Sequence, residues 1–177
     1  MVDLAEIQTA YYMAAATGVI VAAIYYIINL RYSTKAREIE ICRYFSSEWT
    51  SSEALSRWAI FMTMEWKDDE EFMEKYGYSN PEMFGIWVSY FFTYQTAGIL
   101  LKSKVVGDDK LYALGGYGAI KAWEKYKDII QSRRGVAWGE DYMSDFESFA
   151  QEMLKIKMRN DASFRDKLET YRRTKKP

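Results

Sequence analysis

The stretch IQTAYYMAAATGVIVAAIYYIINL, residues 7–30, contains no charged side chain. A helix rises about 1.5 Å per residue, so these 24 residues would extend about 36 Å, and the hydrocarbon core of a bilayer is about 30 Å thick. The stretch therefore predicts a helix that crosses a membrane with some tilt. The rest of the chain is then expected to be held at a membrane surface.

Two other interpretations fit a long apolar run: a cleaved signal peptide and a buried helix of a soluble protein. Signal peptides begin with positive charge, carry a short apolar core and end in small residues at the cleavage site. Here Asp3 and Glu6 precede the run, no Lys or Arg does, and the alanines lie in its middle. These features favour an uncleaved span, and a soluble core helix is the main alternative.

The charges on either side of the run predict its orientation. Arg31, Lys35, Arg37 and Arg43 follow the run. Because positively charged flanks stay in the cytoplasm, we expect a single-pass protein of the cell membrane with its N-terminus outside and its C-terminal domain cytoplasmic. Tyrosines near both ends of the run match the two headgroup regions of the bilayer.

Small residues form a face on this predicted helix. Ala14, Gly18 and Ala22 recur every four residues, and Ala15 and Ala23 lie beside them. Such spacing lets two helix backbones approach closely in lipid, so we predict that this face packs against another transmembrane helix. The pattern does not choose between a second copy and a different protein. The alternative is that alanine is simply common in apolar helices.

The composition after the run favours an all-α fold. Removal of the span leaves about 145 residues, enough for one domain. The chain has 6 Trp, 15 Tyr, 9 Phe and 9 Met to fill a core, and its two prolines are Pro81 and Pro177. We therefore predict one N-terminal transmembrane helix that continues into a compact multi-helix cytoplasmic bundle.

Cysteine and histidine usage narrows the chemistry. Cys42 is the only cysteine, so the chain forms no internal disulfide, as expected in a reducing cytoplasm. The chain has no histidine, which removes the most common general base and transition-metal ligand. No cofactor, metal or catalytic residue is predicted.

The expected organisation has five segments. They are a short extracytoplasmic N-terminus (1–6), the transmembrane helix (7–30), a juxtamembrane helical stalk (31–48), a helical bundle (49–160) and a basic C-terminal helix and tail (161–177).

The C-terminal end differs in charge from the bundle. Residues 31–154 carry a net charge of −5, whereas residues 155–177 carry +6. Four basic side chains near the end are candidates for contact with anionic lipid headgroups or another polyanion: Arg172, Arg173, Lys175 and Lys176. A solvated basic end is the alternative, and nucleic acid is the less favoured polyanion.

Turn and cap signals predict the helices of the bundle. Ser51 or Ser52 suits the start of one helix, and Asn80 followed by Pro81 suits the start of another. Further helices are predicted over residues 70–76, 82–103, 110–134, 140–159 and 162–173. Residues 83–101 lack charge and therefore also permit a second span, but interleaved polar residues favour a core helix.

Two other motifs invite a chemical interpretation. The acids of KDDEE, residues 67–71, are consecutive rather than alternating, so we expect them to start a helix rather than bind a cation. Gly115, Gly116 and Gly118 lack the strand and the Lys-Ser/Thr end of a phosphate-binding loop. We expect these glycines to permit close packing against an aromatic neighbour.

A family resemblance rests on residues 90–134, which read YFFTYQTAGILLKSKVVGDDKLYALGGYGAIKAWEKYKDIIQSRR. Its pieces are GILLK at 98–102, LYALG at 111–115 and WEK at 123–125, with an acidic aromatic segment at 49–76. In these features the chain resembles a prokaryotic domain-of-unknown-function family of single-pass membrane proteins. The resemblance implies a membrane helix followed by a helical cytoplasmic domain, and it implies no catalytic residue.

The expected function is that of a non-catalytic accessory or scaffold subunit of a membrane protein complex, such as one beside a membrane oxidase or monooxygenase. The expected partners are other transmembrane helices, in a homo- or hetero-oligomer, and the bilayer. One alternative is a membrane-tethered module that binds anionic lipid or nucleic acid through its basic tail. The other is a carboxylate-based enzyme, in which five acids would meet in the bundle: Glu48, Glu53, Glu65, Glu124 and Asp145.

Overall fold

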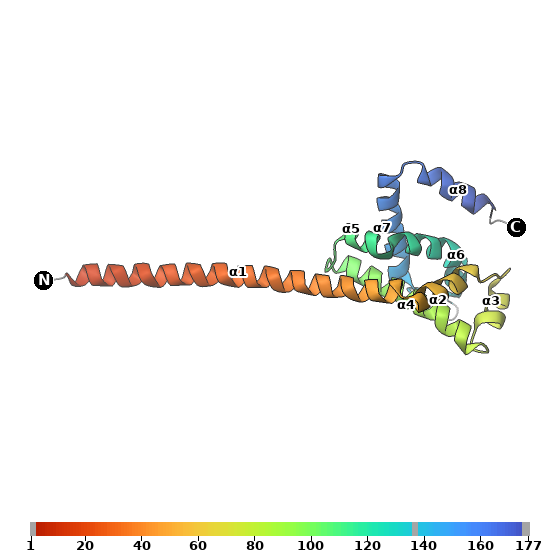
Figure 1. Ribbon diagram of the computed structural model, residues 1–177, viewed down its shortest axis with the longest axis horizontal. Helices are drawn as coiled ribbons and strands as arrows, with labels where there is room; N and C mark the ends of the chain where they lie inside the picture. Colours follow the sequence, from red (N-terminus) through yellow and green to blue (C-terminus); the bar gives the residue numbers. More distant parts are fainter. Residues whose placement is uncertain (1–2, 136–137, 175–177) are drawn as a thin grey trace. The chain divides into compact units, whose positions relative to one another are not determined.

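The computed structural model describes residues 3–135 and 138–174, without the side chains of residues 48 and 171–174. These residues contain helices and no strand, which confirms the predicted all-α class (Figure 1). The helices are α1 (Leu4–Thr50), α2 (Ser52–Thr63), α3 (Asp69–Tyr76), α4 (Pro81–Lys102), α5 (Asp108–Leu111), η1 (Tyr112–Gly116), α6 (Tyr117–Arg133), α7 (Ser144–Asn160) and α8 (Phe164–Thr174). The chain divides into two compact units, Met1–Ile41 and Cys42–Pro177.

The first unit consists of the N-terminal part of α1. Within the described residues, the segment Leu4–Ser47 is the one helix long and apolar enough to cross a membrane, and none of its most apolar part is buried. Val19, Ile20 and Val21 are 59–70% exposed. The long apolar helix expected from the sequence is therefore present, and the described residues leave its most apolar part exposed.

In the second unit, α4 is the central helix. It contacts α2, α3, α5 and α7, and its interface with α7 is the most extensive between any two described helices. Six residues of α4 are buried: Ile86, Trp87, Phe91, Tyr94, Ala97 and Gly98. Residues 83–101 therefore form a core helix of the bundle, as the interleaved polar residues favoured. Asn80 caps this helix and Pro81 is its first residue, also as predicted.

Stacked aromatic rings join α2, α4 and α6. The Phe61 ring stacks on that of Tyr126 with centroids 4.4 Å apart and on that of Tyr90 at 4.8 Å. The Tyr126 hydroxyl donates a hydrogen bond to the Phe61 carbonyl oxygen. Burial raises the pKa of Tyr126, because the charged phenolate would lose its water. Tyr126 therefore joins α6 to the last turn of α2 through both packing and a polar contact.

The first turn of α7 is held by α4. Met143, just before α7, adopts a left-handed conformation with φ 55° and provides no side-chain cap. Instead, the Gln95 side chain accepts a hydrogen bond from the Phe146 amide (2.9 Å) and donates one to the Asp145 carboxylate (3.0 Å). Gly98 permits this approach, since a Cβ there would lie 2.5 Å from the Asp145 carbonyl carbon. The predicted start of this helix at residue 140 is wrong, because the left-handed Met143 interrupts the helix path.

The helix predicted over residues 110–134 is not continuous. It is divided into α5, the π-helical turn η1 and α6, and Gly115 within η1 has non-helical backbone angles. A Cβ at Gly115 would lie 2.5–2.6 Å from ring atoms of Trp49, so the indole occupies that space. Gly118 faces the same region, with Trp49 and Trp58 at 3.5–3.6 Å from an added Cβ. Close packing of these glycines against an aromatic neighbour is confirmed.

Candidate functional site

The small-residue face lies on α1, in the first unit. Ala14, Ala15, Gly18, Ala22 and Ala23 are all exposed, and a Cβ added to Gly18 would meet no atom within 4 Å. The face is therefore open to an incoming helix as far as the described chain is concerned. Its contact with another transmembrane helix stays a prediction.

Hydroxyl groups along the same helix are satisfied within it. The Thr9 hydroxyl donates to the Ala5 carbonyl and the Thr17 hydroxyl to the Met13 carbonyl, each at 2.8 Å. Lipid offers no hydrogen-bond partner, so a side chain that bonds to its own helix loses less on entering the hydrocarbon. These threonines are compatible with a lipid environment.

The basic tail lies largely outside the described residues. α8 continues through Thr174, but the side chains of Arg172 and Arg173 are not described, and Lys175 and Lys176 lie beyond the described range altogether. Their contact with anionic lipid or another polyanion stays a prediction.

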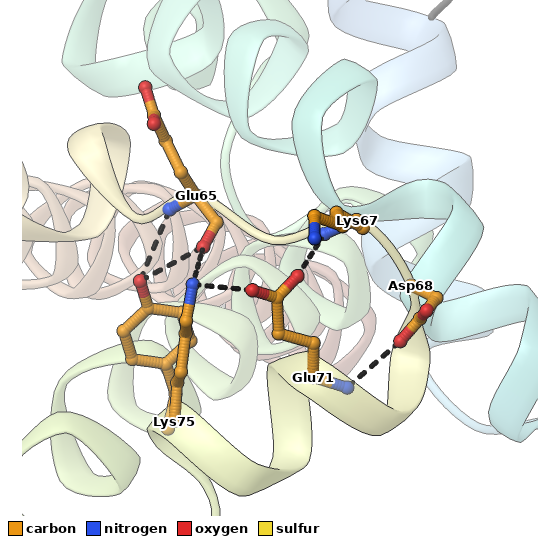
Figure 2. A network of polar contacts seen from close by, with 6 residues as sticks. Glu65, Lys67, Asp68, Glu71 and Lys75 are labelled. Atoms are coloured by element: carbon orange, nitrogen blue, oxygen red, sulfur yellow. Dashed lines mark hydrogen bonds and ion pairs between the residues drawn. The ribbon is translucent and has the colours of Figure 1, made fainter.

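The acidic segment at residues 67–71 has a structural use. Figure 2 shows Asp68, Glu71 and Lys75 joined in one network at the start of α3. The Asp68 carboxylate accepts from the Glu71 amide (2.9 Å), and the Glu71 carboxylate accepts from the Lys67 amide (2.7 Å) and pairs with Lys75 at 2.7 Å. The hydrogen bond from Lys75, followed by that from Lys67, lowers the pKa of Glu71. These acids cap and brace a helix start, as the sequence indicated.

The same segment also connects α3 with α6. The Asp69 carboxylate accepts a hydrogen bond from Nε of Arg133 at 2.7 Å, and a second guanidinium nitrogen lies 2.5 Å from its other oxygen. Such a bidentate pair fixes geometry as well as charge. Both carboxylate oxygens of Asp69 therefore contact the Arg133 guanidinium.

Three of the five carboxylates expected in an enzyme pair with basic side chains instead. Glu53 pairs with Arg57 at 4.0 Å, Glu124 with Lys127 at 3.0 Å, and Asp145 with Lys102. The backbone amide and carbonyl of Glu65 form hydrogen bonds with the Tyr76 hydroxyl. The side chain of Glu48 lies outside the described residues. Among the described residues, no group of three or more Asp, Glu or Cys side chains is arranged to hold a metal ion. The described acids therefore form no shared carboxylate site.

Sequence reasoning missed a half-buried lysine that caps the C-terminal end of α2. The Nζ of Lys125, on α6, donates to the carbonyls of Met62 (2.9 Å) and Met64 (2.6 Å) and lies 5.1 Å from the Trp66 ring centroid. A cation suits the last carbonyls of a helix, which carry partial negative charge. The only signal in the sequence was that Lys125 lies within an apolar stripe, and this pattern does not predict which carbonyls the lysine contacts.

A cavity of about 250 Å³ lies beside α4 and the last turns of α1 and includes Arg57 in its lining. The hydroxyls of Ser89, Thr93 and Thr96 also line it, but each already donates to a backbone carbonyl of α4. The hydroxyl hydrogens of these three residues are therefore already used within α4. The rest of the lining is Arg57 and aromatic side chains.

Comparison of the chain with protein-family models, curated proteins and solved structures gives no match. The family resemblance noted above stays a prediction, and the function is argued from the chain's own residues.

Proposed function

We propose that the chain is a non-catalytic accessory or scaffold subunit of a membrane protein complex, with residues 7–30 of α1 in the bilayer and the bundle at the cytoplasmic face. The observation that carries the proposal is the exposure of α1. No residue is buried in the most apolar part of the segment that is long enough to span a membrane.

Exposure of such a helix to water would be costly. Burial of one Val, Leu or Ile side chain contributes about 1.5–3 kcal/mol relative to exposure. The stretch holds Val19, Ile20, Val21 and Ile24 at 52–70% exposure, so water would be an unfavourable solvent for it. A bilayer would supply apolar surroundings for these side chains. Thr9 and Thr17 could also enter it, because their hydroxyls donate to carbonyls of the same helix.

The accessory role rests on the open face of α1. In lipid, apolar side chains gain little from leaving the tails, so helix association depends on close backbone approach between small residues. Ala14, Gly18 and Ala22 provide that opportunity, and Gly18 has open space beside it. The proposed partner is therefore another transmembrane helix, from a second copy or from a different subunit.

The first experiment tests membrane insertion and orientation. The full chain with a C-terminal tag is expressed, and its membranes are washed with alkaline carbonate and prepared as right-side-out and inverted vesicles. We expect the chain to resist extraction, and added protease to degrade the bundle only in inverted vesicles. Extraction by carbonate, or degradation in right-side-out vesicles, would contradict the proposal.

The second experiment tests the face. Cys42 is replaced by Ser, and single cysteines are placed by Ala14→Cys, Gly18→Cys or Ala22→Cys, with Ile20→Cys as the control on the opposite side of the helix. We expect oxidative crosslinking from the small-residue positions and little from position 20. A product of twice the chain mass identifies a second copy, and other masses identify a different partner. Equal crosslinking from every position would count against a packing face.

A further inference from the structure

A second cavity lies between α6, α7 and α8 and has a volume of about 380 Å³. This volume falls in the range of about 300–1,000 Å³ that is typical of small-molecule sites. We name it the lysine-rimmed pocket. Its lining includes Ile120, Lys121, Lys157, Phe164, Lys167 and Leu168.

The floor of the lysine-rimmed pocket is apolar. Ile120 on α6 and Phe164 and Leu168 on α8 are only 2–8% exposed. Phe164 and Leu168 are four residues apart, so both project from one side of α8. The Tyr117 ring meets that of Phe164 edge-on, with centroids 5.9 Å apart. Apolar side chains from two helices therefore line the floor.

Ammonium groups lie over this floor. The Nζ of Lys121 is 4.7 Å from the Tyr117 ring centroid, and that of Lys157 is 5.2 Å from the Phe164 centroid. Lys157 also lies 5.8 Å from the Tyr117 centroid, so the two lysines share one aromatic ring. Cation–ring contacts of this kind hold the charges above the apolar surface without neutralising them.

The charges of the pocket do not balance. Asp161 is shared between Lys157 at 3.2 Å and Lys167 at 3.8 Å, and Glu124 is paired with Lys127 at 3.0 Å. The hydrogen bond to Asp161 raises the pKa of Lys157, so this ammonium stays charged at neutral pH. Two carboxylates thus face the three lining lysines and Lys127. The surplus is positive, and it lies at the mouth of an apolar cavity.

We propose that the lysine-rimmed pocket binds a single acyl chain that bears an anionic headgroup. The chain would lie on the floor formed by Ile120, Phe164 and Leu168. The carboxylate or phosphate of the headgroup would accept hydrogen bonds from Lys121 and Lys157. This site is a different one from the face of α1, and its occupation does not require the proposed scaffold role.

An acyl anion fits better than a compact anion or a neutral apolar molecule. A small ion such as free phosphate would leave the apolar floor wet, which forfeits the burial of that surface. A neutral hydrocarbon would leave the surplus ammoniums without a counter-charge. An amphipathic anion satisfies both parts of the lining at once. The source of the headgroup, a fatty acid or a lysophospholipid, is a question for the experiment.

The test uses the full chain in nanodiscs of phosphatidylcholine and a photoreactive palmitate with a diazirine in its chain. After irradiation, mass spectrometry maps the crosslinked peptides. We expect crosslinks in residues 117–124 and 164–170, beyond any that arise in α1 from palmitate dissolved in the bilayer. Unlabelled palmitate or lysophosphatidic acid should compete, and whichever competes at lower concentration identifies the preferred headgroup. Palmityl alcohol and lysophosphatidylcholine should compete weakly.

Charge variants complete the test. The double variant Lys121→Gln/Lys157→Gln should lower the crosslink yield in the pocket at least about tenfold, since a factor of about ten is typical of a single lost charge-assisted contact and the variant removes two. The matched control is Lys155→Gln, because Lys155 lies on α7 but is 72% exposed and pairs with Glu152 outside the pocket. Circular dichroism verifies that each variant is folded.

Three results would overturn the proposal. They are crosslinks confined to α1 or spread evenly over the bundle, equal competition by palmityl alcohol, and an unchanged yield in the folded double variant. None of these results bears on membrane insertion or on crosslinking from position 14, 18 or 22, so the two proposals fail separately.

Discussion

Replacement of Gly98 by alanine should disrupt the α4–α7 interface. A Cβ at this position would overlap the Asp145 carbonyl oxygen and would lie 2.5 Å from its carbonyl carbon and 2.9 Å from its Cβ. Carbon atoms pack best at about 3.5–4.0 Å, so the start of α7 must move away by about 1 Å. Because the obstacle is largely backbone, a side-chain rotation cannot relieve it.

The magnitude follows from three contributions. Overpacking typically costs about 1–3 kcal/mol. The displacement also weakens the two Gln95 hydrogen bonds to Asp145 and Phe146, each worth about 0.5–1.5 kcal/mol. Alanine stabilises the helix by about 1 kcal/mol relative to glycine, because its helix propensity is higher. The expected net loss of unfolding free energy is about 1–5 kcal/mol.

Gly85→Ala is the matched control. Gly85 lies on the same helix and is exposed, and a Cβ there would meet no atom within 4 Å. The same substitution should therefore raise stability by up to about 1 kcal/mol. The two variants have identical chemistry and should change the unfolding free energy in opposite directions.

The assay is urea unfolding of the full chain in mild detergent, followed by tryptophan fluorescence. All 6 tryptophans lie after residue 48, so the signal reports on the second unit and not on the exposed part of α1. If Gly98→Ala proves as stable as the parent chain, or gains stability like Gly85→Ala, the close approach of α4 to Asp145 is refuted.

Three further predictions use the same assay. Lys104 has a left-handed backbone, φ 54°, so Lys104→Gly should stabilise by about 0.5–1 kcal/mol, whereas Lys104→Ala, which keeps a Cβ, should not. Tyr126→Phe should lower the unfolding free energy by about 1–2 kcal/mol, because the Phe61 carbonyl loses its donor. Tyr94→Phe should leave stability unchanged or raise it, because the buried Tyr94 hydroxyl has no hydrogen-bond partner among the described residues. Equal losses in the two variants would contradict this contrast. Burial raises the pKa of Tyr142 from 10.0 to about 12. Because the hydroxyl ionises first in the unfolded chain, its contribution to stability is complete below pH 10 and is lost as the pH rises towards 12. Tyr142→Phe should therefore reduce the fall in the urea midpoint over that interval, and an unchanged pH profile would refute the assignment.

Local signals in the sequence predicted much of the fold. The uncharged run at residues 7–30 predicted a helix long and apolar enough to cross a membrane, because length and composition alone determine that property. Asn80 and Pro81 predicted the start of α4, since a cap and its helix lie within three residues of each other. The core role of α4 followed from its mixture of aromatic and polar residues.

Features that depend on distant partners were not predicted. At the break, Gly115 packs against the Trp49 ring, which lies 66 residues earlier in the chain. The lysine-rimmed pocket combines residues from α6, α7 and α8, and no spacing within one helix reveals it. The small-residue face was predicted as a pattern, and its contact with another transmembrane helix stays a prediction.

The contact between Gln95 and Phe146 has a consequence for the order of folding. The hydrogen bond that satisfies the first turn of α7 joins residues 51 positions apart. An intermediate in which α7 has formed without α4 would fray at this end, since Met143 supplies no local cap. The Phe146 amide should therefore exchange its hydrogen only when the α4–α7 pair opens, which makes this single amide a reporter of cooperative closure of the bundle.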